Sequence, residues 1–215
     1  MSEALQIQQE ILSYLEAHRD RYLDAIRTLA RIPAPSNHEE LRAQWCKQHL
    51  EELGATGVYI DDALNVIFPY GVKEGANDLC AILGHTDVVF PDTEPLPFHE
   101  ENGRFYAPGI GDDTRGMVVC LTVARALDAA GIETDGDIVF VGTVEEEGMG
   151  SLGGMKKFLS ENKIDASISV DGPSPIGITY EATGFKTYLL RHRRPCLRRF
   201  RQGCQSAARR SQSGR

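Results

Sequence analysis

Hydrophobic residues recur at helical spacing in the N-terminal part of the chain. Ile7, Ile11 and Leu15 are followed by a second series that starts at Leu23. Positions three or four apart lie on one face of an α-helix. Residues 5–30 are therefore predicted to form one long or two consecutive amphipathic helices.

A further helix is predicted downstream, because Pro33 and Pro35 exclude a continuous helix through this region. It would run from about residue 38 to residue 53. Ser36 or Asn37 would cap its N-terminus, because short polar side chains accept the free N–H groups of a first helical turn.

Short apolar runs bounded by turn residues predict five strands. They cover residues 57–60, 65–69, 78–83, 137–143 and 166–170. The last three are predicted to be buried. Helical patterns at 113–130 and 153–161 alternate with them, and a proline-rich loop covers residues 91–108. This alternation predicts an α/β fold, a three-layer sandwich with a largely parallel central sheet.

Polar clusters follow each of the three strands that are predicted to be buried. They are His85-Thr-Asp87, Glu145-Glu146-Glu147 and Asp171-Gly172-Pro173. In open α/β sheets ligands bind outside the carboxyl ends of the strands, so these clusters are expected to converge. Gly109-Ile-Gly-Asp112-Asp113-Thr-Arg-Gly116 adds two carboxylates just before a helix.

This many carboxylates in one place repel one another and need cations. One imidazole with several carboxylates suits zinc, and also cobalt or manganese, better than calcium, and an Asp that bridges two ions would suggest a pair of metals. The alternative interpretation is that the polar residues cap strand ends and that Glu145–Glu147 form a solvated loop. The acids Glu39 and Glu40 are interpreted as partners of a helix dipole, not as ligands.

Composition narrows the class of protein. No apolar run reaches the length of a membrane span, and the N-terminus lacks the features of a signal peptide, so a cytoplasmic protein without membrane contact is expected. The five Cys are scattered, which argues against disulfides or a thiolate zinc site. All 31 acidic residues lie at or before Glu181, whereas residues 189–215 contain nine Arg and no acid.

The four polar motifs, in their order along the chain, resemble the M20 family of dizinc metallopeptidases, which includes aminoacylases, dipeptidases, tripeptidase T, deacylases and carboxypeptidases. The resemblance covers roughly residues 5–188 and implies hydrolysis of amide bonds in short peptides or N-acyl amino acids. It implies that His85 and Asp171 bind one zinc, Glu147 the other, and that Asp113 bridges them. A cis peptide is expected after Asp113.

Two further roles follow from the resemblance. Asp87 would orient His85, and Glu146 would be the general base. The run of three glutamates leaves its register ambiguous; aligning Thr143-x-x-Glu-Glu selects Glu146 and Glu147. Whether the substrate is a peptide or an acyl amino acid remains open.

The chain departs from the family after Tyr188. Family members continue through a lid domain used for dimerisation and a C-terminal return that supplies a final His ligand. We therefore expect residues 1–188 to be a partial, incomplete catalytic domain without its lid. Residues 189–215 would be a basic segment of little structure, whose composition resembles an out-of-frame reading of a GC-rich gene. One zinc would then bind tightly and a second weakly.

The alternatives are an inactive zinc-binding protein and nucleic-acid binding through the Arg-rich segment. The second is disfavoured, because the segment has a single aromatic residue, Phe200.

Overall fold

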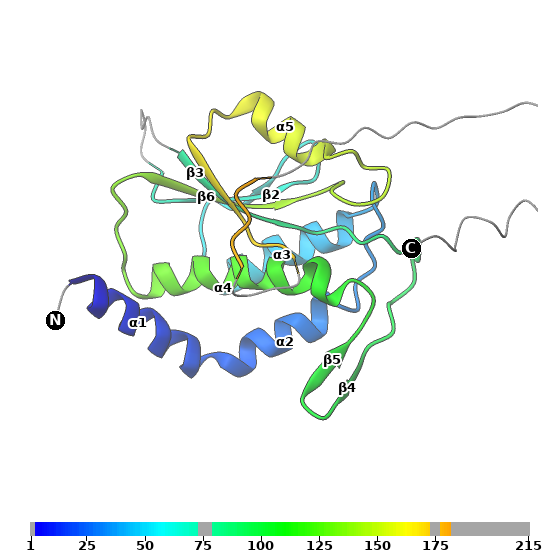
Figure 1. Cartoon of the computed structure of the whole chain (residues 1–215), viewed down its shortest axis with the longest axis horizontal. Helices are drawn as coiled ribbons and strands as arrows, with labels where there is room; N and C mark the ends of the chain where they lie inside the picture. The colour runs from blue at the N-terminus through cyan, green and yellow to red at the C-terminus, as the bar shows by residue number, and fades with distance from the viewer. Residues whose placement is uncertain (1–2, 73–78, 173–176, 182–215) are drawn as a thin grey trace, which may run out of the picture. The chain divides into compact units, whose positions relative to one another are not determined.

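The structure, a computed structural model, describes residues 3–72, 79–172 and 177–181 (Figure 1). The helices, the strands and the candidate site all lie in the unit formed by residues 1–175. The basic segment 189–215 lies outside the described residues, so its expected lack of structure stays a prediction. No helix in the described ranges is long and apolar enough to cross a membrane.

A five-stranded mixed sheet forms the centre of the fold. Its order is β1 (Tyr59–Ile60), β2 (Val66–Tyr70), β6 (Asp137–Thr143), β3 (Leu79–His85) and β7 (Ala166–Ser169). The strands β6, β3 and β7 are parallel, and the β1–β2 hairpin adds to β6 in antiparallel orientation. The predicted α/β class with a sheet built around parallel strands is confirmed.

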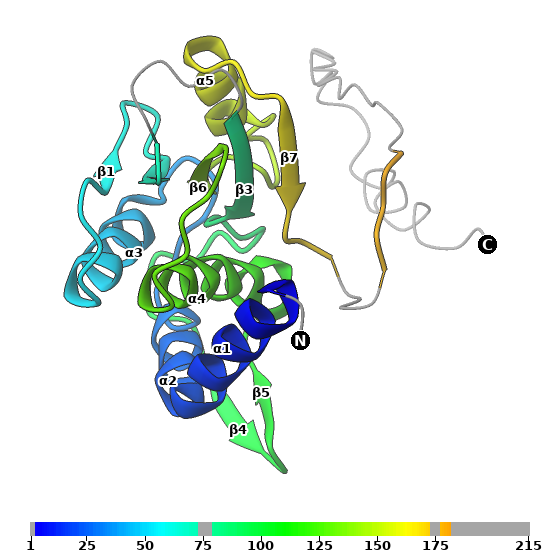
Figure 2. The same ribbon diagram turned by 90° about the vertical axis from the view of Figure 1, so that its left-hand side faces the viewer.

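Helices cover both faces of this sheet (Figures 1 and 2). Helix α5 (Gly153–Glu161) lies on one face, and α3 (Glu40–Glu52) and α4 (Arg115–Ala129) lie on the other. Helices α1 (Glu3–Ala17) and α2 (Arg19–Leu29) contact α4. Of the predicted alternatives for the N-terminal region, one long helix or two consecutive ones, the structure has two. The predicted bounds of β6 and α5 coincide with the observed ones.

Alternation along the strands divides the core into two clusters. Phe68 and Phe140 point toward the helices α2, α3 and α4 and join the larger cluster. Ile67 and Val141, their neighbours in sequence, belong to the second cluster with Phe158 of α5. Successive residues of a strand face opposite sides, so this alternation is what holds three layers together.

Strand β7 differs from the prediction. It was expected to be buried, but all four of its residues are exposed. It pairs with β3 alone among the described residues, and it forms the edge of the sheet. An edge strand that no described element covers has nothing to bury its side chains against.

Two local predictions also need correction. The loop 91–108 contains a short hairpin, β4 (His99–Glu101) and β5 (Arg104–Tyr106). It was not predicted, because these residues show no alternation of polar and apolar positions. Helix α3 is not capped by Ser36 or Asn37; its N-cap is Glu39, and no cap hydrogen bond from a side chain is formed. The Ser36 hydroxyl is used elsewhere, as described below.

Candidate metal centre

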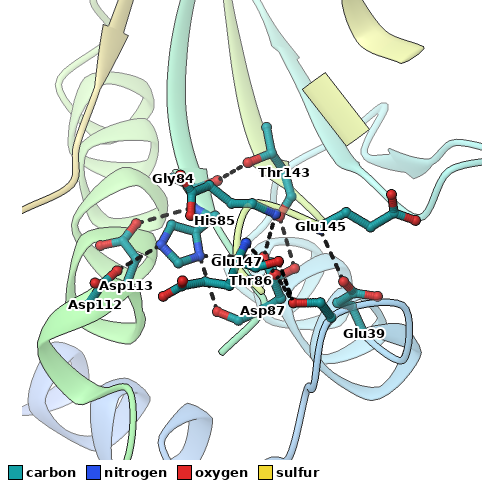
Figure 3. Close-up of polar contacts among 12 residues, drawn as sticks. Glu39, Gly84, His85, Thr86, Asp87, Asp112, Asp113, Thr143, Glu145 and Glu147 are labelled. Atoms are coloured by element: carbon teal, nitrogen blue, oxygen red, sulfur yellow. Dashed lines mark hydrogen bonds and ion pairs between the residues drawn. The ribbon is translucent and has the colours of Figure 1, made fainter. Parts of the chain in front are cut away.

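The carboxyl ends of the parallel strands meet at one edge of the sheet. The register of β3 and β6 pairs His85 with Thr143, so the segments after both strands begin side by side. The N–H of Val170, just after β7, donates to the carbonyl of Leu83 at 2.8 Å. The three polar clusters therefore converge as the sequence predicted, and Figure 3 shows the cluster around His85.

His85 lies at the middle of this cluster and is 3% exposed. Its Nε2 lies 3.0 Å from Oδ1 of Asp112, and its Nδ1 lies 3.1 Å from the carbonyl oxygen of Asp87 and 3.5 Å from Oδ1 of the same residue. Burial opposes protonation, but the hydrogen bonds to Asp87 and Asp112 and the charge of Asp113 outweigh it and raise the pKa of His85 to about 10. The surrounding carboxylates thus favour a positive charge at this position.

Asp87 is fully buried and accepts hydrogen bonds from two sides of the site. Oδ1 accepts the N–H of Glu146 at 3.0 Å, and Oδ2 accepts the N–H of Glu147 at 2.9 Å and the hydroxyl of Ser36 at 2.7 Å. Burial raises its pKa, but these bonds and the contact with His85 reverse the effect, so the pKa is lowered. Asp87 is therefore a stable carboxylate that holds both His85 and the loop after β6.

Two groups of side chains are spaced as cation ligands are. His85, Glu146 and Glu147 form one group, in which the ligand atoms all lie within 4.8 Å of one another. His85, Asp112 and Asp171 form the other, on the same criterion. Because both groups contain His85, they form one continuous site.

The tandem Asp112-Asp113 is arranged differently from the prediction. The cis peptide joins Asp112 to Asp113, whereas it was expected after Asp113. Asp113 is fully buried and belongs to neither group; its Oδ2 accepts the N–H of His85 at 3.1 Å. Asp112 is the member of the pair that contacts the imidazole. Asp112 was not among the predicted ligands, because two adjacent identical residues give no local sign of which one faces the site.

Asp113 also carries a buried oxygen, Oδ1, without a hydrogen-bond partner in the described structure. Burial raises the pKa of this carboxyl to about 7, against the opposing effect of His85. Its carboxylate and the carbonyl of Val170 fill the space that a Cβ on Gly116 would need, which explains a glycine at that point of α4.

Three residues before and within α3 reach the same loops. Ser36 Oγ contacts Asp87 and lies 2.9 Å from the carbonyl of Glu147. Glu39 Oε1 accepts the N–H of Glu145 at 3.0 Å. Arg42 Nη1 donates to the carbonyl of Thr86 at 3.0 Å and to Thr114 Oγ1 at 3.2 Å.

No sequence pattern assigned these residues, which are three positions apart, to the site. Glu39, interpreted from sequence as a partner of the helix dipole, is only 1% exposed.

A hollow of about 670 Å³ adjoins the carboxylates. Asp112 and Glu147 line it on the side of the site, and its remaining wall includes Phe90, Ile110 and Arg115. The hollow is large enough for an amino-acid side chain.

The residues at this edge of the sheet fit divalent cations. The oxygen of Asp113 lacks a partner, and burial together with neighbouring acids raises the pKa of Glu146 and of Glu147. Imidazole with carboxylates is the donor set of zinc, cobalt and manganese sites in hydrolases. Fold and site together define an α/β protein with a candidate metal-dependent hydrolytic centre at the carboxyl edge of its sheet.

Comparison of the sequence with known proteins assigns the chain to a family. The profile of Peptidase family M20/M25/M40 matches residues 81–195, which is more than half of the chain. The chain therefore belongs to this family of metal-dependent peptidases and amidohydrolases.

Individual relatives agree. The chain is 32% identical over 134 residues to a Pyrococcus abyssi protein described as a LysW-lysine/LysW-ornithine hydrolase, covering 62% of this chain and 36% of that protein. It is 31% identical over 136 residues to the cysteinylglycine-S-conjugate dipeptidase of Corynebacterium striatum, covering 56% and 29%. The chain spans about a third of the length of these curated relatives.

Solved structures share the fold. Aminopeptidase PepT from Bacillus cereus superposes with a TM-score of 0.59 at 22% identity, over 72% of this chain and 44% of that one. Human carnosine dipeptidase 1 gives a TM-score of 0.60 at 18% identity, over 76% and 41%. The described fold thus corresponds to part of each of these structures.

Proposed function

We propose that this chain carries the catalytic machinery of a metal-dependent hydrolase that cleaves amide bonds in short peptides or N-acyl amino acids. The observation that supports this most directly is the sharing of His85 between two groups of carboxylates at the carboxyl edge of the sheet. A structural cluster of capping residues would have no need for this arrangement, because like charges at this spacing repel unless a cation separates them.

Four side chains would hold the cations: His85, Asp112, Glu147 and Asp171. Asp112 would take the place among the ligands that the sequence suggested for Asp113, because its Oδ1 lies 3.0 Å from Nε2 of His85. Asp113 would then support the ligand His85 without contacting the cation, because its Oδ2 accepts the backbone N–H of His85. A bound divalent cation would polarise the amide carbonyl and acidify water at the site.

Glu146 is the proposed general base. Burial and the charges of Asp171 and Asp87 raise its pKa, while His85 opposes them. A carboxylate of raised pKa accepts a proton from water more readily and can then donate it to the leaving amine. The N–H of Glu146 donates to Asp87, and this hydrogen bond fixes the backbone from which the Glu146 side chain extends.

The substrate class rests on the family and on the hollow. The relatives described above include a dipeptidase and an aminopeptidase, and a further relative in Halalkalibacterium halodurans is a deformylase of a formylaminopyrimidine. The hollow beside Asp112 and Glu147 offers an apolar wall for the side chain next to the scissile amide and, at Arg115, a cation for a carboxylate.

Metal content and turnover test the proposal with matched variants. Dialysed protein should hold zinc and hydrolyse a dipeptide or an acetylated amino acid. Glu146→Gln should keep the metal and lower kcat by about 10²–10⁴-fold, the range for loss of a general base. Asp112→Asn should lose metal, whereas Asp62→Asn, in an exposed turn, should behave as wild type.

Two results would count against the proposal. Protein that binds no zinc at saturating zinc concentrations would show that these residues do not form a metal site. Tight zinc binding without turnover on any peptide or acyl amino acid would support the alternative, a zinc-binding protein without activity.

A further inference from the structure

The loop after β6 is held by its backbone. The N–H groups of Glu145, Glu146 and Glu147 are consecutive, and each donates to a buried carboxylate. Asp87 accepts the last two, whereas Glu39 accepts the first. The proposed base and cation ligand therefore sit on a segment fixed from two directions.

The burial of Glu39 and its hydrogen bonds fit a role in holding the backbone of the loop after β6. The Glu39 side chain is 1% exposed and lies 106 residues from its partner in the sequence. Its Oε1 also accepts the N–H of Asn37 at 2.9 Å, so one oxygen links the start of α3 to the loop. Burial raises its pKa, and its partners among the described residues are backbone N–H groups that favour the carboxylate.

The loop needs such a contact because its backbone is strained. Glu145 has φ of 59°, in the left-handed region that non-glycine residues seldom adopt. This conformation turns the chain so that the carbonyl of Glu145 accepts the N–H of Leu152 at 2.9 Å while its N–H faces Glu39. A conformation of this kind persists only where surrounding contacts hold it.

We infer that Glu39 is a positioning residue, which holds the Glu145–Glu147 loop in the conformation that presents Glu146 and Glu147 to His85. Ser36 reinforces it, because the hydroxyl contacts both the Asp87 carboxylate and the Glu147 carbonyl. The inference rests on the proposed function for its consequence, but the contact itself can be tested without activity.

Amide hydrogen exchange measures the contact directly. In wild-type protein the Glu145 amide should exchange slowly although the residue is only half-buried. Glu39→Ala should speed its exchange by about tenfold or more, the effect of losing one hydrogen bond of ordinary strength. Glu39→Gln keeps an oxygen acceptor and should restore part of the protection.

Tyr70→Phe is the matched control. It removes another partly buried hydrogen bond, from the Tyr70 hydroxyl to the carbonyl of Ile132 at 2.6 Å, on a residue outside the site. It should leave exchange at Glu145–Glu147 unchanged. If both variants speed exchange at these amides equally, or if the wild-type Glu145 amide already exchanges as fast as an unstructured one, Glu39 has no positioning role.

Cobalt titration, followed by visible absorption, tests the consequence. Glu39→Ala should weaken Co²⁺ binding about tenfold, as expected when one ligand is no longer held in place. In a Glu147→Gln background Glu39→Ala should have no further effect, because the two substitutions act on the same ligand. Additive effects in this double-mutant cycle would overturn the inference.

Should Glu39→Ala fail to fold, Ser36→Ala and Glu39→Gln carry the same comparisons with smaller expected effects. If wild-type protein binds no cobalt while Glu39→Ala still releases the Glu145 amide, the proposed function fails and the positioning role stands. If wild-type protein binds cobalt and Glu39→Ala leaves the exchange of the Glu145 amide unchanged, the proposed function stands and the positioning role fails.

Discussion

Replacement of Asp87 by Ala should strongly destabilise the metal-free protein, even though it removes one of many crowded acids. Repulsion among carboxylates argues for relief when one is deleted. The lowered pKa of Asp87 argues the opposite, because it shows that its hydrogen bonds more than compensate for burial. Deletion would leave the N–H groups of Glu146 and Glu147 without their acceptor, whereas the hydroxyl of Ser36 can still donate to the carbonyl of Glu147.

The expected magnitude follows from the two N–H groups that lose their acceptor. A hydrogen bond to a charged group contributes about 1.5–3 kcal/mol, but such losses are not additive and water will reach part of the space. We expect a loss of about 3–5 kcal/mol, the range found when a buried charged pair is broken. For a domain of this size, this is a large share of the free energy of unfolding.

Asp61→Ala provides the matched control. Asp61 also accepts three hydrogen bonds, from the N–H groups of Ala63 and Asn65 and from Nδ2 of Asn65. It lies in the β1–β2 turn and is partly exposed, so water can replace the carboxylate. Its loss should therefore be about 1–2 kcal/mol.

Urea unfolding in the presence of a chelator measures both losses, with the fluorescence of Trp45, the single tryptophan, as the probe. Should Asp87→Ala not fold, Asp87→Asn serves, because either orientation of the amide turns an N–H group toward a backbone or hydroxyl donor. An Asp87→Ala protein within about 1 kcal/mol of wild type, or no less stable than Asp61→Ala, would refute the reasoning.

Two further predictions concern groups outside the site. Burial lowers the pKa of His49 below 6.5, so its contribution to stability is full above that pH and is lost as the pH falls. Wild type should lose more stability than His49→Asn between pH 7.5 and 5.5 in urea unfolding; equal losses would contradict this. Burial raises the pKa of Cys46 and of Cys120 to about 12, whereas Cys80 is half-buried. Among these three Cys, iodoacetamide at pH 8 should alkylate Cys80 before Cys46 and Cys120, as peptide mapping by mass spectrometry would show, and early labelling of Cys46 would refute the burial argument.

Local patterns were sufficient for much of the fold. The bounds of β6 and α5 could be predicted because apolar runs and flanking turn residues are short-range signals. The strand β3 was predicted in the same way over residues 78–83, and the structure extends it to His85. Convergence of the polar clusters could also be expected, since carboxyl ends of parallel strands meet at one edge of a sheet.

Other features depend on contacts between distant segments. The exposure of β7 depends on its place at the edge of the sheet, which its own residues do not encode. The β4–β5 hairpin has three-residue strands, too short for a period of two to be recognised.

By itself, then, the sequence determined the class of fold, the family motifs and the edge of the sheet at which His85, Asp87, Glu146, Glu147 and Asp171 gather. Only the tertiary structure decided that Asp112 contacts the imidazole while Asp113 is buried behind it, and that Glu39 reaches the loop after β6. The physical reason is the range of the interactions. Periodicity is a property of neighbours in the chain, whereas the direction of a side chain within a loop is set by the hydrogen bonds that remote backbone groups offer it.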